Sequence, residues 1–153
     1  MLNQKKMMKV NILSVFIFTL LVACSSSNED ELNKKETIQV ANGYFLLPPP
    51  GRSVTAGYFD IKNSTEIELS LFGVDSDKFS SIEIHEHKYV GDIMQMRKVD
   101  ELKISSQESI SMNPGGYHLM IFGIPENLTV GDVIDVNLKF IPHQIIPIKL
   151  TAR

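Results

Sequence analysis

Short segments in which apolar and polar residues alternate, separated by turn residues, run from Ile38 to Leu150 and restrict the fold more than any other feature. In residues 81–87, for example, Ile82 and Ile84 alternate with polar side chains. Successive side chains of a β-strand point to opposite sides, so this alternation predicts strands with one buried face. No segment repeats apolar residues at the helical period for more than about two turns. The pattern predicts an all-β domain built as a sandwich of short strands.

The predicted strands are joined by segments rich in glycine, proline, asparagine and aspartate. Residues 48–51, three prolines and a glycine, cannot pair as a central strand because proline has no backbone N–H to donate. This segment is therefore predicted to connect two strands. The predicted strands are residues 38–41, 44–46, 55–62, 66–72, 81–87, 94–98, 108–112, 117–122, 133–140 and 145–150.

Histidine and methionine are concentrated in one part of the chain. Three of the four histidines and four of the seven methionines lie between His85 and Met120. Thioether sulfur is a soft, uncharged ligand that suits Cu(I), whereas imidazole binds copper, zinc, iron and nickel alike. A blue-copper electron-transfer site would also need a cysteine, and the chain has only Cys24. A mixed His/Met set predicts a site that carries copper and does not transfer electrons.

The strands that bear these residues are predicted to form two hairpins. Residues 89–92 have the turn chemistry of a four-residue loop, in which Lys88 would pair with Ile93. Residues 113–116 are a strong turn signal, and in the strand that follows them alternate residues, including both His118 and Met120, share one face. The pairs that the first register predicts are His85 with Met96, His87 with Met94, and Glu83 with Lys98.

Four of these residues follow a known spacing. His85 is followed after ten residues by Met96, then after twenty-one residues by His118, then after one residue by Met120. At these positions the chain resembles the periplasmic PCu(A)C copper chaperones, whose ligand signature has the same separations. The flanking residues are also similar to that family, namely Ile82-Glu83-Ile84-His85-Glu86, Met94-Gln95-Met96-Arg97 and Pro114-Gly115-Gly116-Tyr117-His118-Leu119-Met120.

The resemblance covers residues 38–153 and implies a fold, a ligand set and a role. The implied fold is a cupredoxin-like, Greek-key β-sandwich. The implied function is binding of Cu(I) and its delivery towards the CuA centre of cytochrome c oxidase, to the CuA subunit itself or to another copper chaperone. The implied metal ligands are His85, Met96, His118 and Met120.

Four further histidine and methionine residues lie outside that signature. His87 and Met94 are on the predicted ligand face, so they are either additional metal ligands or strand residues that face solvent. Met112 is predicted to lie in the core, because methionine commonly fills gaps there. His143, beside a proline, is predicted to lie on the surface.

Two other functions compete with copper delivery. A cupin-type metalloenzyme is suggested by His85-Glu86-His87, but Phe79 stands where that motif has glycine, and Gly91 and Asp92 stand where it has glutamate. We therefore predict that the protein is not an enzyme. A copper-binding protein that sequesters the ion, for tolerance or storage, would use the same ligands as a chaperone.

The first 23 residues are predicted to be a lipoprotein signal peptide. They carry three lysines and then the apolar run from Val10 to Ala23, which is too short for a spanning helix and typical of a secretory signal. Leu21-Val22-Ala23-Cys24 resembles a bacterial lipobox, in which the cysteine becomes the new N-terminus and carries acyl chains. The alternative for Cys24 is a free thiol beyond an ordinary cleavage site.

Residues 24–37 are almost entirely polar and are predicted to be a flexible tether between the lipidated Cys24 and a domain of residues 38–153. The predicted location is extracytoplasmic, anchored to a bacterial membrane and facing the periplasm. Removal of residues 1–23 would take away three of 15 basic residues and none of 18 acidic ones, changing the formal net charge from −3 to −6. A chain this acidic is not expected to bind nucleic acid.

Overall fold

The computed structural model describes residues 37–153, which are all-β. The predicted signal peptide and all but the last residue of the predicted tether lie outside the described residues. Within residues 37–153 no helix has the length and apolarity needed to cross a membrane. The strands are β1 (Ile38–Phe45), β2 (Val54–Asn63), β3 (Leu69–Asp75), β4 (Ser81–Val90), β5 (Ile93–Lys98), β6 (Leu102–Ile104), β7 (Ser109–Ser111), β8 (Tyr117–Phe122), β9 (Val133–Ile141) and β10 (Gln144–Ala152).

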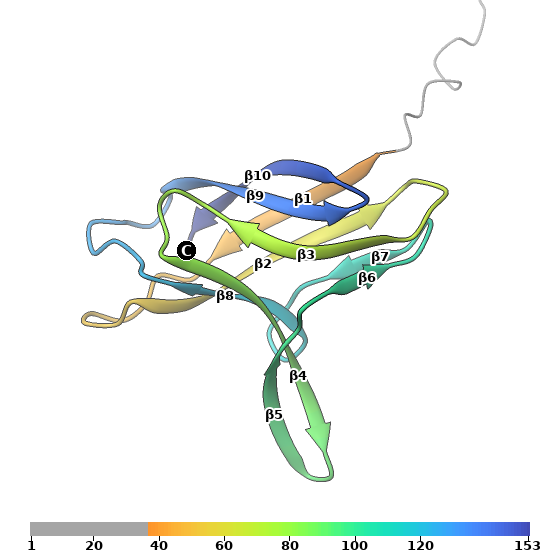
Figure 1. Cartoon of the computed structure of the whole chain (residues 1–153). Coiled ribbons are helices and arrows are strands. Elements are labelled where there is room, and N and C mark those ends of the chain that lie inside the picture. Colours follow the sequence, from red (N-terminus) through yellow and green to blue (C-terminus); the bar gives the residue numbers. More distant parts are fainter. Residues whose placement is uncertain (1–36) are drawn as a thin grey trace, which may run out of the picture. The chain divides into compact units, whose positions relative to one another are not determined.

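All the strands belong to one sheet, whose order is β5-β4-β8-β2-β1-β10-β9-β3-β6, with β7 paired to β2. A further pairing joins β3 to β4 at Val74 and Ile82, so the sheet closes on itself like a barrel (Figure 1). Every strand pair is antiparallel except β1 with β10. The prediction of an all-β domain is confirmed, and the strands form one closing sheet.

The interior of the sheet is apolar, as the alternating pattern requires. Along β9, for example, every second side chain from Ile134 to Phe140 is buried. Burying a large aliphatic or aromatic side chain contributes about 1.5–3 kcal/mol to stability before entropy is counted. The large apolar side chains with the smallest exposure come from both halves of the chain: Phe45, Phe59, Ile61, Leu71, Ile104, Leu119, Ile121, Val136, Leu138, Phe140 and Leu150.

β1 is one strand, where the sequence predicted two. A bulge between Ala41 and Tyr44 interrupts its register with β2, and Asn42 has a positive φ of 55°. Asparagine tolerates this conformation better than most residues. At Gly43 a Cβ atom would collide with the backbone oxygen of Lys149, so only glycine fits there. The bulge explains the break in the alternating pattern.

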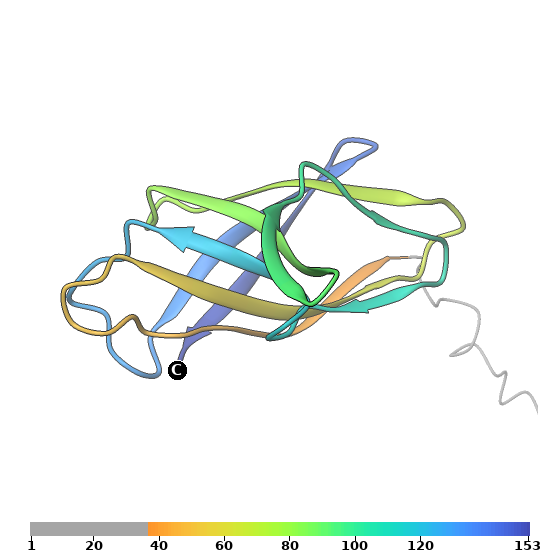
Figure 2. The ribbon, with the colours of Figure 1, turned by 90° about the horizontal axis from the view of Figure 1, so that it is seen from below.

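β4 changes its partners along its length. From Ser81 to Glu86 it pairs with β8, and from His85 to Val90 it pairs with β5. Beyond Glu86 it therefore leaves the barrel, and the β4–β5 hairpin projects from the sheet (Figure 1). Figure 2 looks towards the tip of this hairpin, with the other strands arranged behind it. The histidines of β4 lie where the hairpin leaves the barrel.

Candidate metal centre

His85 and His118 lie beside each other on adjacent strands. His85 of β4 is directly opposite His118 of β8, and their ring centroids are 5.9 Å apart. Directly opposed residues of an antiparallel pair project from the same face of the sheet. The two predicted imidazole ligands, 33 positions apart in the chain, are therefore neighbours.

The two predicted thioether ligands lie diagonally from His85. Met120 of β8 is opposite Glu83, two residues before His85. Met96 of β5 is opposite His87, two residues after His85. Diagonal neighbours on one face of a sheet are separated by about 7–8 Å, a distance that long side chains span. His85 thus stands at the centre of the predicted set, with one imidazole and two methionines around it.

The register predicted for the β4–β5 hairpin is wrong by two residues. Val90 pairs with Ile93 across the two-residue turn Gly91-Asp92, instead of Lys88 with Ile93 across four residues. Gly91 has a φ of 63°, and a glycine at the first position is typical of tight two-residue hairpin turns. A shift of two residues keeps each side chain on its predicted face, whereas a shift of one would reverse the faces. The observed pairs are His85 with Lys98, His87 with Met96, and Tyr89 with Met94.

Glu83 holds His85 in one orientation. Nε2 of His85 donates a hydrogen bond to Glu83 Oε2 at 2.9 Å, and Glu83 Oε1 accepts one from Lys98 Nζ at 2.9 Å. The hydrogen bond from His85, and then the one from Lys98, keep the pKa of Glu83 below its usual range. Nδ1 of His85 is buried and has no hydrogen-bond partner. Because a carboxylate only accepts, the proton of the neutral ring is on Nε2 and the lone pair is on Nδ1.

Removing the Glu83 carboxylate should therefore change the tautomer of His85. Long-range ¹H–¹⁵N NMR of the copper-free protein should find the Nε2–H form in the wild type. Glu83→Ala, which removes the acceptor, should give a mixture of both tautomers, and Glu83→Gln, which keeps an acceptor oxygen, should preserve Nε2–H. Glu86→Ala, on the opposite face of β4, is the matched control. An unchanged tautomer in Glu83→Ala would contradict the orienting role.

His118 is oriented by the backbone of the turn before β8. Its side chain is buried, with only 3% of its surface exposed, and Nδ1 lies 3.1 Å from the carbonyl oxygen of Gly116. The same carbonyl accepts a hydrogen bond from the backbone N–H of His87 at 3.2 Å. Burial lowers the pKa of His118 below 6.5, and the nearby His87 and His85 lower it further, against the Gly116 hydrogen bond. His118 is therefore neutral at neutral pH, with its lone pair on Nε2.

His87 stacks on His118. The two ring centroids are 4.7 Å apart and the rings are nearly parallel, at 21°. Nδ1 of His87 is buried and has no hydrogen-bond partner. His87 lies directly opposite Met96, so it borders the predicted set on the side of the hairpin. The structure thus brings a third imidazole to the group, as one of the sequence interpretations allowed.

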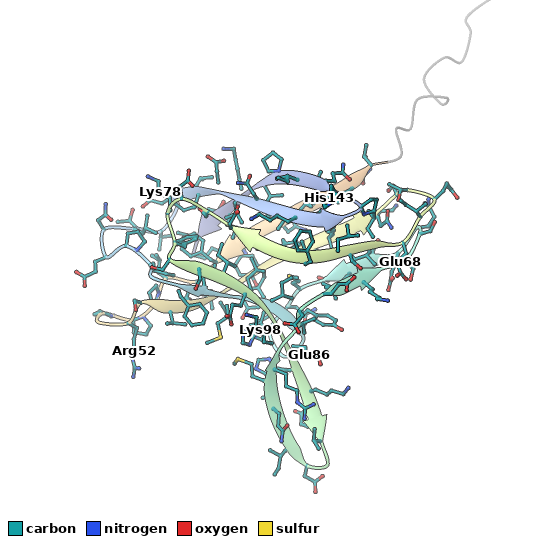
Figure 3. The ribbon with its side chains drawn as sticks, in the orientation of Figure 1. Arg52, Glu68, Lys78, Glu86, Lys98 and His143 are labelled. Carbon is teal, nitrogen blue, oxygen red and sulfur yellow. The ribbon has the colours of Figure 1, made fainter. Side chains whose placement is uncertain are left out.

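The other candidate residues, Met94, Met112 and His143, differ in their exposure to solvent. Met94 is half exposed near the hairpin tip, on the same face as Met96. Met112 is buried and His143 is exposed, which confirms both predictions. Figure 3 shows Lys98 where the hairpin leaves the barrel, with sulfur atoms nearby, and His143 on the other side of the domain. Within residues 37–153, no three His, Cys, Asp or Glu side chains are grouped so as to hold a metal without thioether ligands.

The fold is that of the PCuAC domains, as superposition on solved structures shows. The copper-bound PCuAC domain of PmoF2 superimposes with a TM-score of 0.63 and 21% sequence identity over 76% of this chain and 92% of that domain. Cu(I)-bound DR1885 of Deinococcus radiodurans superimposes with a TM-score of 0.62 and 21% identity over 74% of this chain and 76% of that one. At this identity the likeness concerns the fold.

Sequence comparison gives the family. Residues 38–151 match the family described as "Putative lipoprotein LpqE-like", and the chain belongs to this LpqE-like family. The "Putative lipoprotein Lxx21020" of Leifsonia xyli subsp. xyli (strain CTCB07) is 29% identical over 118 residues, which are 76% of this chain and 69% of that protein. Protein RP573 of Rickettsia prowazekii (strain Madrid E) is 30% identical over 89 residues, 58% of this chain and 49% of that protein.

Proposed function

We propose that this protein is a copper chaperone that binds one Cu(I) ion as its cargo. The proposed ligands are the Nδ1 atom of His85, the Nε2 atom of His118, and the sulfur atoms of Met96 and Met120. The observation that carries the proposal is the register of three strands, in which His118 is opposite His85 and the two methionines lie diagonally from it. Two neutral imidazoles and two thioethers are a soft donor set that favours Cu(I) over harder cations.

The state of the two histidines supports this proposal. His85 has a buried Nδ1 without a partner, and a buried nitrogen left unpaired costs about 1–3 kcal/mol. Coordination of the ion would satisfy that nitrogen. Glu83 and the Gly116 carbonyl each bond the other nitrogen of one ring, as outer partners of metal-binding histidines commonly do.

Delivery is favoured over sequestration by the exposure of one side of the site. His118 is buried, but Met96 is 48% exposed on the projecting hairpin. An acceptor protein can therefore approach a bound ion from the side of Met96. We propose the CuA centre of cytochrome c oxidase, or another copper chaperone, as the acceptor, and no enzymatic activity.

The proposed location is the periplasmic side of a bacterial membrane, where a lipid on Cys24 anchors the domain through a tether that ends at residue 37. Matches to proteins described as lipoproteins support this location. We also propose that the closed sheet is a cupredoxin-like, Greek-key arrangement. The position of β2 between β1 and β8, two strands that are far apart in the sequence, supports that topology.

A competition titration tests the function. The full-length protein, purified in detergent, would be titrated with Cu(I), Cu(II) and Zn²⁺ against chelators of known affinity. We expect one equivalent of Cu(I) to bind more tightly than either of the other ions, and the His85→Ala/Met96→Leu variant to lose it. Preferential binding of Zn²⁺, or binding that survives in this variant, would refute the proposal.

A further inference from the structure

The ligand face of the β4–β5 hairpin continues beyond the proposed site towards solvent. On β5, Met94 lies two residues before Met96, and on β4, Tyr89 lies two residues after His87. Exposure rises outward along this face, from 3% at His118 to 48% at Met96 and 51% at Met94. A row of soft donors thus leads from the buried end of the site to the hairpin tip.

His87 lies at the junction between the buried and exposed parts of this row. It is stacked on His118 and directly opposite Met96. Met94 is its diagonal neighbour on β5, a separation that a methionine side chain spans. The unpartnered Nδ1 of His87 is therefore an imidazole donor within reach of an inner ligand and of the exposed thioether.

β5 is an edge strand, and this leaves the face open along one side. Its partner on one side is β4, and it stands at the end of the strand order. Five of its six residues are exposed, so no other element of the described chain covers Met94 or Met96. Methionine side chains are flexible and adapt to different geometries, which suits a ligand that exchanges.

We propose that His87 and Met94, together with Met96, form an outer Cu(I) site through which the ion enters and leaves the inner site. This inference rests on the proposed function. In each step a bond from Cu(I) to an inner ligand breaks as a bond to His87 Nδ1 or Met94 sulfur forms. The ion stays Cu(I), and the thioether neither gains nor loses a proton. Met96 belongs to both sites and is the shared ligand.

The direction in which a substitution changes the rate of Cu(I) escape distinguishes an outer relay ligand from an inner ligand and from a surface residue. Loss of an inner ligand weakens the site and should speed the escape of Cu(I), because the ion is held less tightly. Loss of an outer relay ligand should slow the escape, because the ion must leave the inner site without a soft donor to receive it. Loss of a residue that only lies on the surface should leave the rate of Cu(I) escape unchanged.

The experiment uses full-length protein in detergent, loaded with one equivalent of Cu(I). Stopped-flow absorbance would follow transfer to excess bicinchoninate, a chelator that becomes coloured on binding Cu(I). Met94→Leu, which keeps the side-chain size and removes the sulfur, should slow transfer about tenfold, a barrier higher by about 1.4 kcal/mol. His87→Phe, which keeps a ring to stack on His118 and removes the nitrogens, should also slow it.

The matched control is Ile93→Leu, a substitution on the other face of the same strand, which should transfer Cu(I) at the wild-type rate. Faster transfer in Met94→Leu would make Met94 an inner ligand, and an unchanged rate would make it a surface residue; both results would overturn the outer site. A wild-type protein that binds no Cu(I) would instead refute the proposed function, and the outer site with it.

Discussion

Replacing His118 with alanine should weaken Cu(I) binding by more than about 100-fold. Loss of a residue that merely orients a metal ligand typically costs about 10–100-fold in affinity, and loss of a proposed ligand should cost more. His118 is buried, and its Nδ1 is tied to the Gly116 carbonyl, so its free nitrogen is held in place before the ion arrives. A flexible side chain that replaced this preorganised donor would lose conformational entropy on binding the ion.

The pKa of His118 adds to this effect. Protons compete with a metal for imidazole, and binding therefore weakens as the pH falls through the pKa of the ligand. Because burial and the two neighbouring histidines lower the pKa of His118 below 6.5, the ring stays neutral in mildly acidic solution. The wild type should thus release Cu(I) at a lower pH than a site whose limiting histidine has an ordinary pKa.

The measurement is a competition titration of Cu(I) against a chelator, with circular dichroism to verify that the variant is folded. His143→Ala is the matched control, because His143 is an exposed histidine in the turn between β9 and β10 and far from the site (Figure 3). It should bind Cu(I) as the wild type does. A folded His118→Ala protein with unchanged affinity would remove His118 from the proposed ligand set.

Replacing Cys24 with serine should release the protein from membranes. Each buried methylene of an acyl chain contributes about 0.8 kcal/mol, so two or more chains give stable anchoring, whereas a serine at this position carries none. We expect nearly all of the wild type in the membrane fraction after high-salt washing, and Cys24→Ser in the soluble fraction.

Fractionation of cells followed by immunoblotting measures this distribution. Ser25→Ala, which leaves the cysteine in place, is the control and should stay with the membranes. Metabolic labelling with a palmitate analogue should label the wild type and not Cys24→Ser. If Cys24→Ser remains in the membrane fraction, the lipobox interpretation is wrong.

The fold prediction rests mainly on the alternation of apolar and polar residues and on the spacing of the turns between them. β8 is predicted with its observed bounds, because residues 117–122 are mostly apolar and follow a strong turn signal. β6 was missed, because three residues are too short to display a period. The two predicted segments of β1 are one strand, because a bulge at Asn42 and Gly43 breaks the alternation without ending the pairing.

The sequence by itself determined which residues share a face of each strand, since that depends only on the two-residue period of the backbone. It therefore determined that His85 and His87 lie on one side of β4, and that His118 and Met120 lie on one side of β8. Only the tertiary structure decided which residues meet across strands. The hairpin register differs by two residues because a tight turn at Gly91 matches the strand twist better than the longer loop.

The tertiary structure also decided the neighbour of β4. The pairing of β4 with β8 places His85 opposite His118, which follows from closure of the sheet and not from the local pattern of either strand. Burial and the Gly116 carbonyl then set the charge and orientation of His118, and Glu83 sets the orientation of His85. Local periodicity specifies faces, whereas long-range pairing and desolvation specify a site.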